Sequence, residues 1–152
     1  MDSIRLVPAH SRHIGTIAKR LRLIDAEECA AAGRTPKQAL RLGLLTSDKA
    51  WTALVDDRPE AMFGVVTVDA IGGEATPWFL GTDEVYRHGR ALLMWGPGMI
   101  ERLCDSRMRL SNLVSARNSR AIRLLRRWGF TVGEDRVNVR GIPFLHFWKE
   151  AR

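Results

Sequence analysis

The spacing of apolar residues divides the chain into helical and extended stretches. Apolar side chains recur every three or four residues in the first third, as in helices, and largely at every second residue in the middle, as in strands. Ser11 and the pair Thr35-Pro36 are typical of helix starts, and Gly33 is typical of a helix end. This pattern predicts strands over residues 4–7, 51–55, 61–68, 76–80, 110–114, 131–139 and 142–148, and helices over residues 11–21, 24–32, 36–45, 83–105 and 118–128.

The order of these elements predicts the fold class. At 152 residues the chain has room for one domain, spanning residues 1–152. A strand, helices, an antiparallel hairpin and then alternating strands and helices form an α/β plan with a mixed sheet. We expect Gly96-Pro97-Gly98 to interrupt the fourth helix, because Pro97 has no backbone N–H to donate. The parallel crossover over about residues 76–114 is the expected ligand site.

Positive charge is concentrated in one segment. The chain carries a net charge of +7, and residues 87–127 alone hold ten arginines against Glu101 and Asp105. Such a field attracts phosphate groups, on a cofactor or on nucleic acid. The alternative is that the excess of arginine over lysine reflects only the base composition of the genome.

Cysteine usage and the absence of long apolar runs indicate the compartment. Cys29 and Cys104 are the only cysteines, and neither has a His or Cys nearby in sequence with which to share a metal ion. We therefore expect free thiols in a reducing compartment and no metal site. No apolar run reaches the roughly 18 residues of a membrane-spanning helix, and the first residues do not resemble a secretory signal. The expected location is the cytoplasm, with no membrane partner.

The stretch from Val114 to Phe130 resembles a known motif. Asn118 can cap a helix, Ala121 is small enough to pack closely on a sheet, and Gly129-Phe130 turns the chain and fills a core position. Their spacing resembles the second conserved motif of the GNAT superfamily of N-acetyltransferases. The resemblance implies a mixed, mostly antiparallel sheet flanked by helices, with splayed central parallel strands. It also implies that acetyl-CoA binds between those strands, with a contact at Asn118.

Residues 86–91 resemble part of the first motif of the same superfamily, a Gln/Arg-x-x-Gly-x-Gly/Ala loop. Gly89 and Ala91 match it, while Tyr86 stands where Gln or Arg is usual. The resemblance implies that backbone amides here face the cofactor pyrophosphate at a helix N-terminus. The alternative is a surface helix over residues 83–95 that contains one glycine, which would remove the loop. Three arginines could add phosphate contacts: Arg87, Arg90 and Arg117.

Acetyl transfer to an amine needs a base, a hydrogen-bond donor for the thioester oxygen and usually a proton donor for the departing thiolate. In the superfamily a strand backbone amide holds the oxygen, which the resemblance places within Phe79-Leu80-Gly81. The acid is often a tyrosine of the second motif, but Leu125 stands at that position, and the only tyrosine is Tyr86. The candidate bases are Glu74 and Glu84, followed by Asp83, His88 and His146; the alternative for each is a solvated or structural residue.

A narrower resemblance covers most of the chain. Trp51, residues 62–65, residues 77–82 and residues 118–130 together resemble an acetyltransferase-like family of tailed bacteriophages, some of whose members are internal virion proteins. One hypothesis is therefore an acyl-CoA-dependent N-acyltransferase that acetylates an amine of unknown identity. The alternative is a catalytically degenerate phage protein of the same fold, located in the host cytoplasm or virion and binding a virion or host protein. A nucleic-acid partner would instead give binding that weakens steeply with salt.

Overall fold

The computed structural model describes residues 4–103 and 107–151, so Cys104 lies outside the described residues. A seven-stranded sheet with the order β1-β2-β3-β4-β5-β7-β6 forms its centre. Neighbouring strands are antiparallel except β4 and β5, which are parallel. This confirms the predicted mixed, mostly antiparallel sheet. The strands are β1 (Ile4–Pro8), β2 (Lys49–Val55), β3 (Arg58–Asp69), β4 (Glu74–Gly81), β5 (Arg109–Ser115), β6 (Thr131–Val139) and β7 (Ile142–Lys149).

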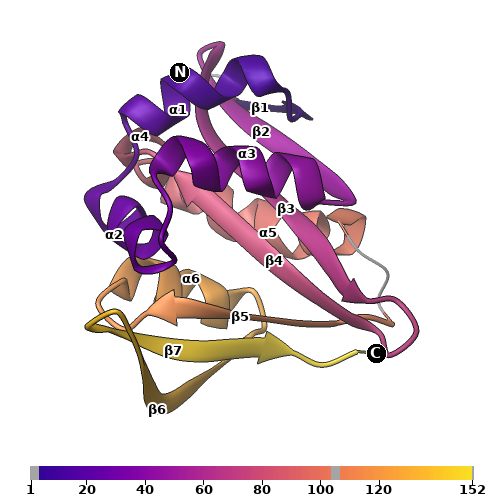
Figure 1. Cartoon of the computed structure of the whole chain (residues 1–152). Coiled ribbons are helices and arrows are strands. Elements are labelled where there is room, and N and C mark those ends of the chain that lie inside the picture. Colours follow the sequence, from indigo (N-terminus) through magenta and orange to yellow (C-terminus); the bar gives the residue numbers. More distant parts are fainter. Residues whose placement is uncertain (1–3, 104–106, 152) are drawn as a thin grey trace.

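Helices cover both faces of the sheet (Figure 1). One face carries α1 and α3, and the other carries α5 and α6. No helix among the described residues has both the length and the apolar character needed to cross a bilayer. The helices are α1 (Ile14–Lys19), which follows a single 3₁₀ turn (Ser11–His13), α2 (Leu23–Ala31), α3 (Pro36–Thr46), α4 (Asp83–Tyr86), α5 (Gly89–Leu103) and α6 (Ser119–Arg127).

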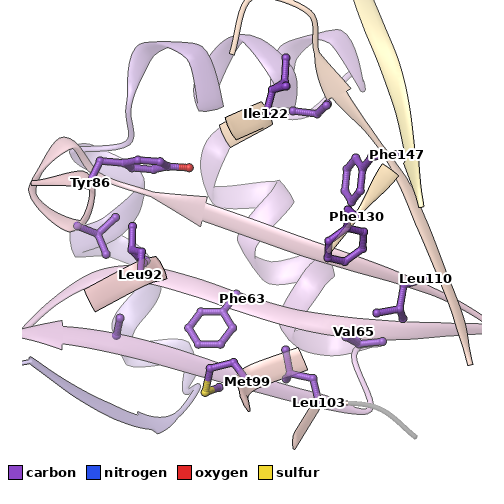
Figure 2. Close-up of a cluster of buried hydrophobic side chains, with 14 of the residues drawn as sticks. Phe63, Val65, Tyr86, Leu92, Met99, Leu103, Leu110, Ile122, Phe130 and Phe147 are labelled. Atoms are coloured by element: carbon purple, nitrogen blue, oxygen red, sulfur yellow. The ribbon is translucent and has the colours of Figure 1, made fainter. Parts of the chain in front are cut away.

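Alternation along the strands produces two hydrophobic cores, one on each face. Met62 of β3 faces α1 and α3, where it packs with Ile17 and Leu40. Its neighbour Phe63 faces the opposite way, into the larger core beneath α5 and α6, which Figure 2 shows. Successive strand residues point to opposite faces, so one strand supplies both cores. Cys29 of α2 is buried and free, as expected.

The two central parallel strands separate along their length. β4 and β5 pair only at Glu74↔Arg109 and Ala75↔Leu110, at the first residues of each strand. Beyond these pairs the strands diverge, and in Figure 1 their arrowheads lie well apart. We call the space between the unpaired parts of the two strands the β4–β5 opening. Its presence confirms the splayed parallel strands that the resemblance implied.

The prediction that Gly96-Pro97-Gly98 interrupts a helix is wrong, because α5 continues through Pro97 to Leu103. The reason is tertiary packing. The indole of Trp128 lies directly against Gly96, where any side chain would overlap it, and its Nε1 donates a hydrogen bond to the Leu92 carbonyl at 3.0 Å. These contacts hold the helix together around the hydrogen bond that proline cannot make.

Two predicted helices also differ from the structure, one at its start and one in its continuity. The 3₁₀ turn before α1 is capped by His10, where a cap at Ser11 was predicted: the His10 ring accepts a hydrogen bond from the Arg12 amide, and His13 accepts one from the His10 amide. The helix expected over residues 83–105 is divided into α4 and α5 by a turn at Arg87 and His88. By contrast, Thr35 caps α3 as predicted.

Candidate functional site

A cavity of about 440 Å³ lies at the β4–β5 opening. Its walls come from both strands and from α2, α3 and α6, so it extends through the gap in the sheet from one face toward the other. At the closed end the side chain of Asn112 bridges the strands: its Nδ2 donates to the Pro77 carbonyl at 2.8 Å, and its Oδ1 accepts from the Leu113 amide at 2.7 Å. The cavity therefore begins where the parallel pairing stops.

The backbone of β4 offers to this opening one pair of polar groups that have no partner among the described residues. The Thr82 amide donates to Glu60 of β3, whereas the Gly81 amide and carbonyl face the other way and bond to Asp25 and to the Arg22 amide. Alternation along a strand places the N–H and C=O of Phe79 on the same side as those of Gly81. Register with β5 has already ended at Ala75, so the Phe79 groups face the opening.

The three residues expected to hold the thioester oxygen thus differ in position. Phe79 presents its backbone to the opening. Leu80 pairs with Met62 of β3, so its backbone faces away from the opening although its side chain lines the cavity. The Gly81 amide already donates to the Asp25 carboxylate at 2.9 Å. Of the three, the geometry favours Phe79.

The turn between α4 and α5 exposes a helix N-terminus. The amides of Arg87 and His88 bond back to α4, and the first hydrogen bond of α5 runs from the Leu92 amide to the His88 carbonyl. The amides of Gly89, Arg90 and Ala91 precede that bond, as the first amides of every helix do. A methyl group on Gly89 would meet no atom within 4 Å, so space is open beside these amides. Residues 83–91 are therefore neither one continuous helix nor an extended loop.

Arginines lie on the segments next to this helix N-terminus. Arg87 and Arg90 are exposed beside it, and Arg117 is exposed at the start of the turn into α6. Arg87 pairs with Glu84 at 2.9 Å. Arg120 of α6 donates to the Tyr86 carbonyl at 2.8 Å, which ties α6 to the end of α4. The positive segment found in the sequence thus lies partly at the N-terminus of α5.

Helix α2 connects the ends of the two separated strands. Its Asp25 accepts the Gly81 amide of β4 and pairs with Arg22 at 3.5 Å, and its Glu28 accepts the Ser115 amide of β5 at 3.1 Å. In Figure 1, α2 lies beside the arrowheads of β4 and β5. Each amide would be unpaired without α2, because the strands are too far apart to pair with each other.

The same cluster reaches the cap of α6. The Asn118 side chain accepts from the Ala121 amide at 3.4 Å, which confirms it as the N-cap, and its Nδ2 donates to Glu28 at 3.1 Å. Arg22 donates to Asn118 Oδ1 at 3.3 Å, and its guanidinium carbon lies 3.8 Å from the centre of the Tyr86 ring. Asn118 therefore has a structural role that accounts for its position in the motif.

Burial shifts the acidity of these groups. It raises the pKa of Asp25 to about 7, against the opposing effects of the Gly81 hydrogen bond and of Arg22. It also raises the pKa of Glu28, which the bonds from Asn118 and Ser115 oppose. The pKa of Tyr86 is raised for the same reason, so this tyrosine keeps its proton. A carboxyl with a raised pKa is a stronger base when ionised.

The carboxylates singled out in the sequence lie elsewhere. Glu74 is at the closed end of the opening, where it pairs with Arg109 at 3.7 Å. Glu84 lies on α4 and pairs with Arg87, and its Oε1 lies 3.8 Å from His88 Nε2. Neither lines the cavity, and the two lie near opposite ends of β4, so the structure does not bring them together. Asp83 is exposed at the start of α4, and His146 stacks on Trp148.

Sequence reasoning missed Arg22, Asp25 and Glu28. The three side chains recur at intervals of three residues and so share one face of the helix, which was the available signal. A charged helical face is usually solvated, and nothing local indicates that this one is turned toward two strand ends. Among the described residues there is no group of three His, Cys, Asp or Glu side chains that could hold a metal ion.

The fold is that of GNAT acetyltransferases. No family model matches the chain, and no curated protein matches it in sequence. Solved structures do match over nearly its whole length, at identities that show the fold alone. A candidate acetyltransferase of Acinetobacter baylyi ADP1 has a TM-score of 0.73 at 14% identity, covering 99% of this chain and 94% of that one.

Two other matches contain coenzyme A. The aminoglycoside acetyltransferase AAC(6')-Ib, in complex with ribostamycin and coenzyme A, has a TM-score of 0.69 at 15% identity and covers 99% of this chain and 94% of its own. The ribosomal L7/L12 alpha-N-protein acetyltransferase RimL, in complex with coenzyme A, has a TM-score of 0.67 at 11% identity. The match covers 97% of this chain and 93% of RimL.

Proposed function

We propose that the chain binds acetyl-CoA in the β4–β5 opening and transfers the acetyl group to an amine. Enzymes of this fold that bind coenzyme A and act on amines, AAC(6')-Ib and RimL, support the proposal. The observation that carries it is the free backbone of Phe79, which faces a cavity of about 440 Å³ where the parallel pairing has ended. A sheet that served only as a scaffold would gain by closing this gap, since pairing satisfies backbone groups.

The residues present fit the cofactor in two places. The Phe79 C=O could accept a hydrogen bond from an amide of the pantetheine arm, which leaves the Phe79 N–H to polarise the thioester oxygen. The amides of Gly89, Arg90 and Ala91 could hold the pyrophosphate, with Arg87 and Arg117 as charged neighbours. A contact at Gly81 would require Asp25 to release the amide it now holds. Bound acetyl-CoA would supply an electrophilic thioester carbonyl.

Calorimetric titration of acetyl-CoA into the protein tests this proposal. The wild type should release heat and show a raised Tm at saturation. Gly89→Asp should weaken binding by about tenfold or more, because a carboxylate beside the free amides of α5 repels phosphate. Gly98→Asp is the matched control, since it adds the same charge to the same helix at another open position. Absence of heat and of any Tm shift with the wild type would end the proposal.

A non-catalytic protein of the same fold is the second candidate. Two features favour it. Leu125 lines the cavity at the position where a tyrosine often acts as the general acid in the superfamily. The Gly81 amide already donates a hydrogen bond to Asp25. The second candidate predicts either that acetyl-CoA does not bind, or that acetyl-CoA binds but no amine causes release of free thiol. The structural matches are acetyltransferases, so an internal virion role rests on the sequence resemblance to the phage family. Mass spectrometry of purified phage particles would detect the protein if that role is correct.

A further inference from the structure

Glu28 is the acidic side chain of the cavity that keeps one oxygen uncommitted. Its Oε1 accepts both the Ser115 amide and the Asn118 side chain, each at 3.1 Å. No described residue donates a hydrogen bond to its Oε2, and the side chain lines the cavity. Asp25, the other carboxylate there, has both oxygens engaged, by Gly81 and by Arg22. Glu28 is therefore fixed in position through one oxygen while the other can receive a ligand.

The walls around Glu28 are largely apolar. Trp78 of β4, Leu113 of β5 and Phe144 of β7 line the same cavity, with Leu42 of α3 at its side. A volume of about 440 Å³ is at the lower end of small-molecule sites. If the thioester end of the cofactor takes part of that volume beside Phe79, only a compact acceptor fits in the rest.

The charge at the edge of the cavity limits the acceptor further. Arg34, which follows α2 and is exposed, lines the cavity together with Glu28. Its positive charge adds repulsion for each further ammonium group that an acceptor carries, while one ammonium can be paired by Glu28. This charge arrangement favours an acceptor with one ammonium group over one with several.

We propose that Glu28 binds the ammonium group of the acceptor through Oε2 and takes its proton, and that the acceptor is a primary monoamine on a compact apolar body. The proposal rests on the acetyl-transfer function put forward above. Glu28 of α2 and Phe79 of β4 line the same cavity. The proton acceptor and the backbone N–H donor therefore face the same bound molecule.

The chemistry balances without a further reactant. Glu28 takes one proton from the ammonium, which leaves a nitrogen lone pair free to attack the thioester carbonyl carbon. The C–N bond forms, the C–S bond breaks, and the second nitrogen proton passes to the departing sulfur to give a free thiol. The proton on Glu28 returns to solvent. The products are one amide, one thiol and one released proton.

Direct binding of 2-phenylethylamine, with 2-phenylethanol as the uncharged probe, tests the ammonium site without any cofactor. The full chain is titrated at millimolar probe by NMR. In the wild type the amine should bind more tightly than the alcohol. Glu28→Gln, which keeps an oxygen to accept from Ser115 and Asn118, should weaken the amine about tenfold or more and leave the alcohol unchanged. Glu27→Gln, the same charge change one residue away, should alter neither.

Equal binding of the two probes to the wild type, no binding of the amine, or an unchanged amine affinity in Glu28→Gln would each overturn the proposal. Turnover gives the second readout, as thiol release from acetyl-CoA. Glu28→Gln should lower kcat/KM for 2-phenylethylamine about 100-fold or more, with the acetyl-CoA Kd within about threefold, and ribostamycin should be a poor acceptor. If wild type binds acetyl-CoA but the variant turns over equally fast, only the Glu28 assignment fails. If wild type does not bind acetyl-CoA, the proposed function fails and the probe titration still decides the ammonium site.

Discussion

Replacing Gly96 with alanine should destabilise the protein, although alanine is the better helix former. The new methyl carbon would overlap the indole of Trp128. Its distance to the indole atoms would be far below 3.0 Å, and Cβ atoms in proteins essentially never approach another atom that closely. Overpacking of this kind costs about 1–3 kcal/mol. Displacing the indole also breaks its hydrogen bond to the Leu92 carbonyl, for about 1 kcal/mol. The gain in helix propensity offsets about 1 kcal/mol, so the net loss should be about 1–3 kcal/mol.

Gly98 provides a matched control in the same helix. A methyl group there meets no atom within 4 Å, so Gly98→Ala should stabilise the protein by up to about 1 kcal/mol. Urea unfolding at equilibrium measures both variants. In a Trp128→Leu background, Gly96→Ala should lose its penalty, which a double-mutant cycle reveals as coupling. If Gly96→Ala and Gly98→Ala shift the midpoint alike, α5 and α6 do not pack as described.

Two further predictions concern the groups around α2. The pKa of Asp25 is raised to about 7, so its favourable contribution is complete below the unfolded value of 3.8 and is lost as pH rises to about 7. From pH 3.8 to about 7 the free energy of unfolding of the wild type should therefore fall relative to that of Asp25→Asn, by at most about 4 kcal/mol. Urea midpoints measured across this range would show the fall. Parallel pH curves for the two proteins would contradict the prediction. Asn118→Ala should cost more than the about 1 kcal/mol of an ordinary cap, because Glu28 also loses a donor. Thr35→Ala, which removes an exposed cap, is the comparison in the same unfolding assay, and equal losses would show that the Glu28 contact contributes nothing.

The elements that local chemistry controls were predictable. Asn118 caps α6 because its short amide side chain reaches the free amides of the first turn, and that preference is visible in the sequence alone. The hairpin of β6 and β7 follows from alternation on either side of Arg140-Gly141, both of which adopt positive φ. In such cases the deciding interactions lie within a few residues of one another.

Features that depend on distant contacts were not predictable in the same way. A break at Gly96-Pro97-Gly98 is the correct expectation for an isolated helix, and it fails here because Trp128, far along the chain, fills the space over Gly96. The role of Glu28 depends on the Ser115 amide, from which it is separated by 87 residues. Its own neighbours in sequence give no sign that this amide needs an acceptor.

The splayed strands and helix α2 depend on each other. Separating β4 from β5 leaves the Gly81 and Ser115 amides without strand partners, and a buried amide without a partner costs about 1–3 kcal/mol. Asp25 and Glu28 supply the missing acceptors, so α2 keeps the opening stable in the absence of a ligand. The same contacts set a condition on binding. A ligand that pairs with Phe79 alone leaves α2 in place, whereas one that also pairs with Gly81 must displace the Asp25 carboxylate. Because that carboxyl is half protonated at a pH of about 7, its hold on the Gly81 amide is weakest on the acidic side of neutrality.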